Sequence, residues 1–316
     1  MGYQVPFPSE LQQVEYVKLY FQLELVTSLK LPALALLQLR RELLQALRSF
    51  PELNADFFRQ VQQLLSPALA TDPVIQRLVQ KPAPALVISP LQILEKELSA
   101  NDVIVLPIIF IGSGMNTIDS FIKLLSHLGD CGLIHGRGKF FISSISGEDG
   151  SGHCLNVELT QSAQGKTVFP VNNLKWWLER QEQLPGVVEI ELISPMRCIK
   201  KSKPLFKAEF VEVFPFILRR ITSLIASHIG VEFRYDVARL LSVAATIKGV
   251  NNRLEWQDWR TLKSDDRHQS LGGLMGTITI RGDDLCELMW VLQLGTLFNC
   301  GKGAAYGAGQ YRLLCV

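Results

Sequence analysis

The chain has 316 residues, of which 47% are hydrophobic and 20% are charged, so it is long enough for two domains that each bury a core. Its 32 basic residues nearly balance its 30 acidic ones, and the formal net charge is +2. This balance excludes a globally basic protein, so any polyanion must be bound by a local patch.

The six cysteines form no Cys-x-x-Cys pair, and their spacing from the histidines is not that of a zinc site. We therefore expect buried thiols in a reducing compartment, with no metal and no other cofactor. The first residues lack the basic start and apolar core of a signal peptide, and the apolar stretch at 101–112 is too short to span a bilayer. These features predict a cytoplasmic protein.

The first half of the chain predicts the order β-α-β-β-α-β. Residues 15–25 alternate between apolar and polar side chains, as in a half-buried strand, and residues 33–50 are rich in Leu and Ala at helical spacing. A looser region holds a second helical stretch at 54–69. The remaining expected elements are strands at 85–89 and 103–112, a helix at 115–130 and a strand at 136–145.

The second half predicts the same order again. Residues 186–199 alternate as a strand, and residues 207–230 predict a helix in which Pro215 is expected to begin or kink the main segment. The remaining expected elements are a strand pair at 249–259 and 272–282, a helix at 283–295 and a strand at 306–314.

Both halves run from their second helix through a glycine-rich turn into their last strand. The two turns read "DCGLIHGRGKFFI" and "NCGKGAAYGAGQYRL" and align with each other. An internal repeat of this kind predicts an α+β protein with two tandem ferredoxin-like domains. We place the N-terminal domain at residues 1–185, including a connector at about 147–185 with a turn and a short amphipathic helix, and the C-terminal domain at 186–316.

The glycine-rich end of the chain is the first candidate binding site. A hairpin turn with a bulge needs about two glycines, whereas this loop has four around one lysine and one tyrosine. Bare backbone with free N–H groups and a nearby lysine suits a phosphodiester chain, and RNA fits this description. The residues expected to contact RNA here are Gly301, Lys302, Gly303, Tyr306, Gly307, Gly309 and Gln310.

Common catalytic signatures are missing. Lys302 is followed by glycine, so the loop is not a Walker phosphate loop, and no Ser-His-Asp or two-carboxylate pattern is evident. The stretch "GSGMNTID" at 112–119 could bind an anion at a helix start, but a plain strand-to-helix turn is the simpler interpretation.

Several motifs, in order along the chain, resemble the CRISPR endoribonucleases of the RAMP superfamily that process precursor crRNA, the sixth Cas family. The resemblance is best in the second half. The motifs are "LPALALLQLRRELLQAL" and "LGDCGLIHGRGKF" in the first half and "ISPMRC", "FPFILRRITSL", "SLGGLMGTITI" and "LGTLFNCGKGAAYGAGQYRL" in the second.

The resemblance implies metal-independent cleavage of a CRISPR repeat by attack of a 2′-hydroxyl on the adjacent phosphate, which leaves a 2′,3′-cyclic phosphate. Such a site needs a base, an acid and a cation on the phosphate. This chain departs from the family pattern, because it has no histidine before residue 127 and has Asn299 where part of the family has the histidine of His-x-Gly-Lys.

Among the five histidines, His135 is the favoured catalytic candidate, together with Lys139. His135 lies between glycines beside Arg137 and Lys139, a setting that places an imidazole near cations and phosphate, although a plain loop histidine is the alternative. Arg137 is expected to bind RNA. The other histidines are expected to cap a helix dipole (His127), to contact RNA from a loop (His268), or to be structural or solvated (His153 and His228).

Two arginine doublets occupy corresponding first helices, Arg40-Arg41 and Arg219-Arg220. Neighbouring helix residues do not point the same way, so each doublet should have one outward arginine that can reach phosphate or bridge the halves. A solvated helix face is the alternative.

The first hypothesis is therefore a repeat-binding endoribonuclease with RNA in a groove between its halves. The alternatives are a repeat-binding protein that does not cleave, and a structural RAMP subunit of a crRNA effector complex, against which the duplication argues. The candidate partners that the resemblance implies are CRISPR repeat RNA, an effector complex, and a fused or associated reverse transcriptase and integrase.

Overall fold

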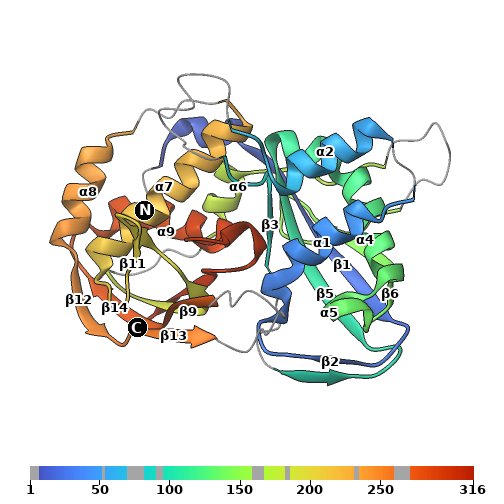
Figure 1. The fold of residues 1–316 in the computed structure, drawn as a ribbon. Coiled ribbons are helices and arrows are strands. Elements are labelled where there is room, and N and C mark those ends of the chain that lie inside the picture. The colour runs from blue at the N-terminus through green and yellow to red at the C-terminus, as the bar shows by residue number, and fades with distance from the viewer. Residues whose placement is uncertain are drawn as a thin grey trace. The chain divides into compact units, whose positions relative to one another are not determined.

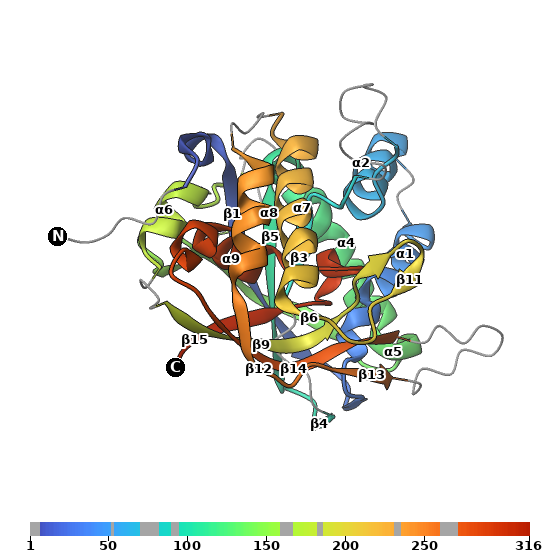
Figure 2. The same ribbon diagram turned by 90° about the vertical axis from the view of Figure 1, so that its left-hand side faces the viewer.

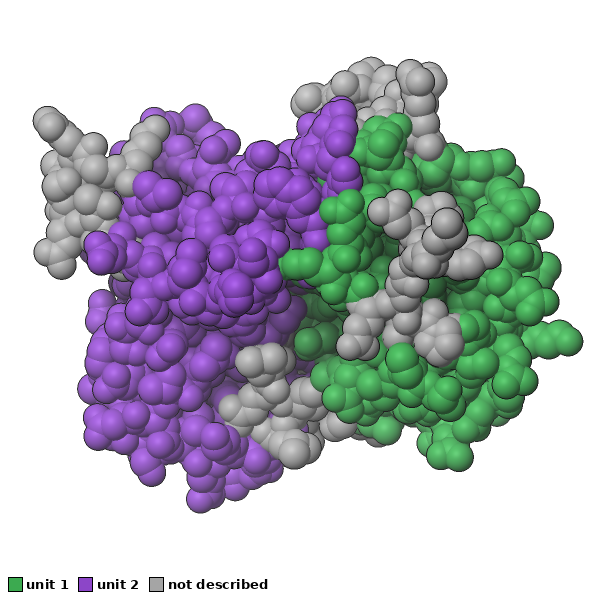
Figure 3. Space-filling model, turned by 180° about the vertical axis from the view of Figure 1, so that it is seen from behind, with its two compact units in different colours: residues 1–11, 178–222, 232–316 green, residues 12–177, 223–231 purple. Residues whose placement is uncertain are grey.

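The computed structural model describes residues 7–51, 54–69, 82–89, 95–158, 167–181, 186–230, 235–259 and 271–316. Contacts divide the chain into two compact units, which are coloured separately in Figure 3. Unit 1 comprises residues 1–11, 178–222 and 232–316, and unit 2 comprises residues 12–177 and 223–231. None of the described helices has the length and hydropathy that a membrane span requires.

Unit 2 is built on one antiparallel sheet with helices on one face (Figure 1). In spatial order its strands are β3 (Leu86–Ile88), β5 (Val103–Ile111), β1 (Glu15–Leu25), β6 (Phe140–Glu148) and β7 (Cys154–Asn156), and β8 (Asn172–Asn173) also pairs with β1. Its helices are α1 (Leu39–Arg48), α2 (Ala55–Leu65), α4 (Ile118–Cys131), α5 (Leu133–Gly136) and α6 (Leu174–Glu179), which runs into unit 1, and β2 (Leu29–Leu31) pairs with β4 (Lys96–Leu98).

The core of unit 2 follows from the alternation in β1. Phe21 faces the helices and is fully buried, as are its strand neighbours on the same face. The Phe121 ring of α4 packs edge-on against Phe21 and against Phe110 of β5, with ring centroids 6.1 Å and 5.4 Å apart. Aromatic edge contacts of this kind add to the burial of apolar area and hold α4 on the sheet.

Unit 1 repeats this architecture. Its sheet runs β12 (Lys248–Asn252), β14 (Leu271–Arg281), β9 (Val187–Met196), β15 (Tyr311–Cys315), and β13 (Glu255–Trp259) continues the pairing of β12 along β14. The other elements are the hairpin β10 (Ile199–Lys200) and β11 (Lys203–Pro204) and the helices α7 (Phe210–His228), α8 (Val237–Thr246) and α9 (Leu285–Phe298). Helix α8 packs beside α9 (Figure 2).

The two sheets have equivalent strand orders, β6-β1-β5-β3 in unit 2 and β15-β9-β14-β12 in unit 1. In each, the first and third strands of the βαββαβ unit are central, which is the ferredoxin-like arrangement. The structure therefore confirms the predicted α+β fold with two ferredoxin-like units.

The duplication extends to one glycine near the end of each second helix. A Cβ at Gly129 of α4 would overlap the carbonyl oxygen of Phe140, and a Cβ at Gly295 of α9 would overlap the hydroxyl of Tyr311. Phe140 and Tyr311 are the first residues of the last strands, so both helices approach those strands at the same place.

Some sequence-based expectations differ from the structure. Pro215 does not begin a helix, because α7 starts five residues earlier at Phe210. Residues 306–310 are not strand, because Gly307 and Gly309 have positive φ angles, and β15 begins only at Tyr311. Helix α8 was not predicted. Of the six cysteines, which are all free thiols, only Cys198 and Cys300 are buried, so the expectation of buried thiols fails for the other four.

Candidate nucleic-acid interface

The glycine-rich loop of unit 1 is fastened to the end of β9. The Lys302 amide donates to the Arg197 carbonyl at 2.8 Å, and the Gly309 amide donates to the Pro195 carbonyl at 3.0 Å. Ser194 completes the attachment, since its hydroxyl donates to the Gly307 carbonyl at 2.6 Å and accepts from the Gln310 amide at 2.9 Å. The loop is thus an ordered part of the sheet edge.

Two of its glycines are required by this internal packing. A Cβ at Gly309 would overlap the Cys300 carbonyl, and a Cβ at Gly301 would lie 2.8 Å from the Arg197 carbonyl oxygen. Both residues also have positive φ angles, which favour glycine. Close approach of RNA is therefore not needed to explain Gly301 and Gly309, whereas the exposed positions Lys302 and Gly303 remain available to a ligand.

Two polar side chains of the loop region point into the protein. Tyr306 is 5% exposed, so its side chain is not available to RNA in this structure. Asn299 is fully buried, and its amide nitrogen donates to the Ala304 carbonyl at 3.1 Å. Asn299 thus braces the loop from inside and is not a surface group that could replace a catalytic histidine.

The second arginine doublet divides as expected, with one arginine outward. Arg219 is exposed. The guanidinium of Arg220 turns inward, where its Nε donates to the Phe298 carbonyl at 3.3 Å, at the end of α9. Burial lowers the pKa of Arg220 to about 10. A cation at a helix C-terminus is favoured by the helix dipole, so Arg220 supports the start of the loop and does not reach a ligand.

Two buried thiols, Cys198 and Cys300, lie at the start of the glycine-rich loop of unit 1. The hydrogen bond with Cys198, and then burial, raise the pKa of Cys300 well above its usual value. Cys300 is therefore a neutral thiol that packs as a small apolar group.

In unit 2 the equivalent turn carries His135 on α5. Ile134 and His135 have positive φ angles of 48° and 61°, an uncommon conformation for residues other than glycine. The turn is held by Thr27, whose hydroxyl donates to the Arg137 carbonyl at 2.8 Å and accepts from the Lys139 amide at 3.0 Å. The exposed side chains of His135, Arg137 and Lys139 therefore project from an ordered turn.

Arg41 of α1 lies against this histidine. Its Nη2 is 3.2 Å from Nδ1 and 3.4 Å from Nε2 of His135, although the two residues are 94 positions apart. The neighbouring Arg40 instead donates to the Ser66 hydroxyl at 2.8 Å. The structure thus gathers an imidazole, one contacting guanidinium and the cations of the turn on one exposed region of unit 2, a grouping that sequence position alone did not reveal.

The remaining histidines have other surroundings. His127 packs edge-on against Phe50, with its Nε2 3.2 Å from the Ser49 hydroxyl, in a position that covers the end of α1. His228 donates to the Ala83 carbonyl at 2.6 Å, which fits a structural role, and His153 is exposed beside Asp149. His268, predicted to contact RNA, lies outside the described residues.

A polar cluster that the sequence did not reveal lies on β1. Lys18 forms an ion pair of 2.6 Å with Glu148, and the Tyr20 hydroxyl donates to the same carboxylate at 2.9 Å. Burial disfavours the charge of Lys18, but the hydrogen bonds to Glu148 and Tyr20 outweigh it and the pKa of Lys18 is raised. All three groups are satisfied by one another, which favours a structural role.

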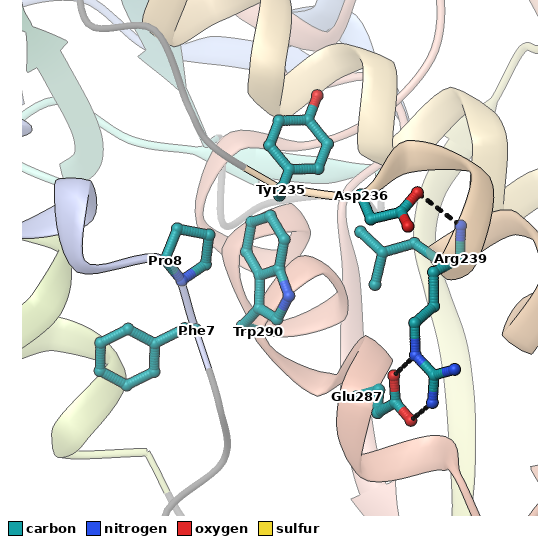
Figure 4. Close-up of a pocket in the computed structure, with 8 residues that line it drawn as sticks. Phe7, Pro8, Tyr235, Asp236, Arg239, Glu287 and Trp290 are labelled. Carbon is teal, nitrogen blue, oxygen red and sulfur yellow. Dashed lines mark hydrogen bonds and ion pairs between the residues drawn. The ribbon is translucent and has the colours of Figure 1, made fainter.

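A pocket of about 320 Å³ lies elsewhere in unit 1 (Figure 4). Arg239 closes one side and donates to Glu287 through two nitrogens, at 2.9 Å and 2.6 Å. Glu287 and Trp290 belong to the first turns of α9, whereas the glycine-rich loop follows its last turn. The pocket is lined by Phe7, Pro8, Tyr235, Asp236, Arg239, Leu240, Glu287 and Trp290, and it holds none of the predicted site residues.

Part of unit 1 matches a known protein family. Residues 190–311, which span β9 to the first residue of β15, match the family model of the CRISPR-associated endoribonuclease Cas6. The match confirms the resemblance to the Cas6 family. No curated protein sequence matches the chain.

Solved Cas6 structures share the fold along nearly the whole chain. A Thermus thermophilus Cas6 superposes with a TM-score of 0.55 at 12% identity, covering 95% of this chain and 99% of that one. A Cas6 product complex gives a TM-score of 0.54 at 13% identity, with the same coverage. A partial Cas6-RT-Cas1–Cas2 complex gives 0.58 at 14% identity and covers 95% of this chain and 46% of that one. At these identities the similarity shows a common fold.

Proposed function

We propose that the chain binds CRISPR repeat RNA and cleaves it without a metal ion, as a precursor-crRNA processing endoribonuclease. The observation that carries the proposal is the contact between Arg41 and His135 on the glycine-rich turn of unit 2. The Cas6 family match and the solved Cas6 product complex support the same activity class.

In the proposed reaction His135 accepts the proton of the 2′-hydroxyl. The 2′-oxygen forms a bond to the adjacent phosphorus, and the bond from phosphorus to the 5′-oxygen breaks. Lys139 donates a proton to the departing 5′-oxygen. The products are a 2′,3′-cyclic phosphate and a 5′-hydroxyl. Positioned acids and bases of this kind contribute roughly 100- to 10,000-fold to a rate.

Arg41 is the proposed cation on the phosphate that carries the developing negative charge. Its guanidinium lies beside the imidazole, so a phosphate held by Arg41 would be next to the proton acceptor. Arg137, Lys302 and Arg219 are the exposed cations proposed to bind the rest of the RNA backbone. Among the backbone amides of the glycine-rich loop, the exposed Gly303 is the one proposed to contact RNA, because the Lys302 amide already donates to the Arg197 carbonyl.

The test is single-turnover cleavage of the cognate repeat RNA in EDTA, with the product ends identified by mass spectrometry. We expect a cyclic phosphate product, and loss of cleavage when the nucleotide before the scissile phosphate is 2′-deoxy. His135→Ala should slow cleavage at least 100-fold and change the RNA Kd only a few-fold. His153→Ala is the matched control and should cleave at the wild-type rate.

A second candidate function is repeat binding without cleavage. It is favoured by Asn299, which is buried and structural at the position where part of the family has a histidine. Tight repeat binding with no product in the same assay would support this candidate. Wild-type cleavage by His135→Ala would instead show that the endoribonuclease uses another base.

We also propose a reverse transcriptase and integrase as partners, fused or associated. The support is the similarity to the Cas6-RT-Cas1–Cas2 complex, in which the matched region is less than half of the solved chain. Copurification of the native protein with reverse transcriptase activity would support this proposal. Copurification with a crRNA effector complex and without reverse transcriptase activity would contradict it.

A further inference from the structure

We propose that the hairpin β10–β11 and the aromatic pair Phe206 and Trp256 form a second RNA-binding surface on unit 1, which stacks a single-stranded base of the bound RNA. The inference rests on the proposed function, because it takes CRISPR repeat RNA as the ligand. It adds a binding surface outside both glycine-rich turns.

The aromatic pair reaches the surface of unit 1 and does not belong to its buried core. Phe206 follows the hairpin and is 57% exposed, and its ring lies against that of Trp256 with centroids 4.8 Å apart and planes at 62°. A folded protein gains little from leaving a phenylalanine ring in water, so an exposed aromatic ring beside a second one suggests a contact surface. Every nucleic-acid base has a flat π-face that can stack on such a ring.

The position of Trp256 is built into the sheet. A Cβ at Gly272 of β14 would lie 2.5 Å from the Trp256 ring, so glycine leaves the space that the indole occupies. The segment after the hairpin is attached to the same sheet, because the Asn252 side chain donates to the Ala208 carbonyl at 3.0 Å. Both rings are therefore held on ordered backbone, which lowers the entropy cost of binding.

Lysines lie on the hairpin that precedes Phe206 and directly after Phe206 in the sequence. Lys201 and Ser202 form the two-residue turn of the hairpin, with φ angles of 49° and 65°, and this turn presents the lysine to solvent. Lys200 forms an ion pair of 3.4 Å with Glu212. The exposed charged residues of the hairpin and its flanks are Lys200, Lys201, Lys203, Lys207 and Glu209, and the neighbouring strands add Lys248, Arg253, Glu255 and Asp258.

This combination identifies RNA as the occupant. Aromatic rings with lysines on their border bind bases by stacking and phosphates by charge. The surface also continues from the first site along the chain, since Arg197, whose carbonyl holds the Lys302 amide, is two residues before β10. The backbone from Arg197 to Lys201 spans at most about 14 Å, so one RNA strand on Lys302 can reach the hairpin.

The test measures the Kd of repeat RNA by fluorescence anisotropy over a range of salt concentrations. Phe206→Ala should weaken binding about 5- to 100-fold, the loss expected for one stacked base, without changing the salt slope. Phe206→Tyr should restore binding, because tyrosine also stacks. The double variant Lys201→Ala/Lys203→Ala should reduce the slope of log K against log salt by about 1.4, or about 0.7 for each lysine.

Matched controls separate this surface from general effects. Trp176→Ala removes an aromatic ring of unit 2 that is 50% exposed, and Lys123→Ala removes an exposed lysine of α4; neither should change the Kd or the slope. Both control variants should also keep the wild-type melting temperature and cleavage rate.

The outcomes distinguish the two proposals. If wild-type protein neither binds nor cleaves repeat RNA, the proposed function is wrong and this inference falls with it. If the wild type binds and cleaves but Phe206→Ala and the double lysine variant bind as tightly, only the second surface is wrong.

Discussion

Arg40 and Arg41 are neighbours in sequence but contact different side chains of unit 2. Arg40 donates to Ser66, whereas Arg41 lies against His135. The sequence predicted that the two arginine side chains of such a doublet point in different directions, since adjacent helix positions are about 100° apart. It could not predict which member meets the histidine, because that contact joins residues 94 positions apart.

This difference allows a test within one doublet. Arg41→Ala should slow cleavage of repeat RNA by roughly 100-fold at saturating RNA, because it removes the cation proposed to stabilise the transition state. Arg40→Ala removes the same charge from the same helix and should leave the saturated rate within a few-fold of wild type. Equal single-turnover rate losses in the two variants would indicate a general electrostatic effect and contradict a specific role for Arg41.

Arg220 offers a second test at the residue scale, on stability. Its pKa is lowered to about 10 by burial, so its charge at neutral pH has a desolvation cost of roughly 3 kcal/mol. Arg220→Met keeps most of the volume and removes that charge, so the free energy of unfolding should stay within about 1 kcal/mol of wild type. Arg220→Ala leaves a cavity and should cost about 2–4 kcal/mol.

Urea unfolding of both variants would measure these differences. Arg219→Ala is the control for the doublet, since Arg219 is exposed; it should not change stability but should weaken RNA binding. If Arg220→Met is as destabilised as Arg220→Ala, the guanidinium contributes through its hydrogen bonds, and the charge argument is wrong.

At the scale of elements, hydrophobic periodicity was a good guide to the strands and helices that form the two cores. The alternation of residues 15–25 predicted β1 with its bounds, because the core face of a strand needs every second residue. Residues 306–310 were misassigned as strand. Their fold depends on positive φ angles at Gly307 and Gly309 and on bonds to Ser194, which no local pattern encodes.

The close approach of α9 to β15 predicts a specific pair of coupled substitutions. Gly295→Ala places a Cβ on the Tyr311 hydroxyl, which donates to the Leu292 carbonyl at 2.6 Å, and overpacking there should cost about 1–3 kcal/mol. Tyr311→Phe alone should cost about 1 kcal/mol through the lost hydrogen bond. The double variant should be more stable than the sum of the two losses predicts.

A double-mutant cycle from thermal or urea unfolding measures this coupling. The reason for the expected sign is that Tyr311→Phe removes the atom with which the new methyl group collides. Additive losses would mean that Gly295→Ala acts through another neighbour, of which Ile217 is the nearest alternative.

For the whole molecule, the order of elements in the sequence was enough to predict the duplicated fold, because βαββαβ has few compact arrangements. The sites were less predictable. The two glycine-rich turns could be found by their composition, but the side chains gathered around His135, and the inward direction of Arg220 and Tyr306, depend on contacts across the sequence. His135, Lys139 and the RNA-binding residues therefore remain predictions.

Each unit contains a segment from the other half of the chain, so we predict that the chain cannot be cut into two halves that fold independently. A cut between residues 177 and 178 would separate residues 12–177 from 223–231, which belong to the same unit. Within that unit His228 donates to the Ala83 carbonyl and lies 3.2 Å from the Ser113 hydroxyl, and Gly112 approaches the His228 carbonyl so closely that a Cβ would overlap it. The fragment 1–177 loses all of these contacts.

We therefore expect fragment 1–177 to melt at a lower temperature than the intact chain, or to aggregate on expression, because it exposes the part of unit 2 that His228 and Ile229 contact. His228→Ala in the intact chain should lower the melting temperature by a few degrees only, since it removes two polar contacts and keeps the apolar ones. A peptide of residues 223–231 added to the fragment should raise its melting temperature. If the fragment alone is as stable as the intact chain, each half folds independently and the sequence-based boundary near residue 185 is sufficient.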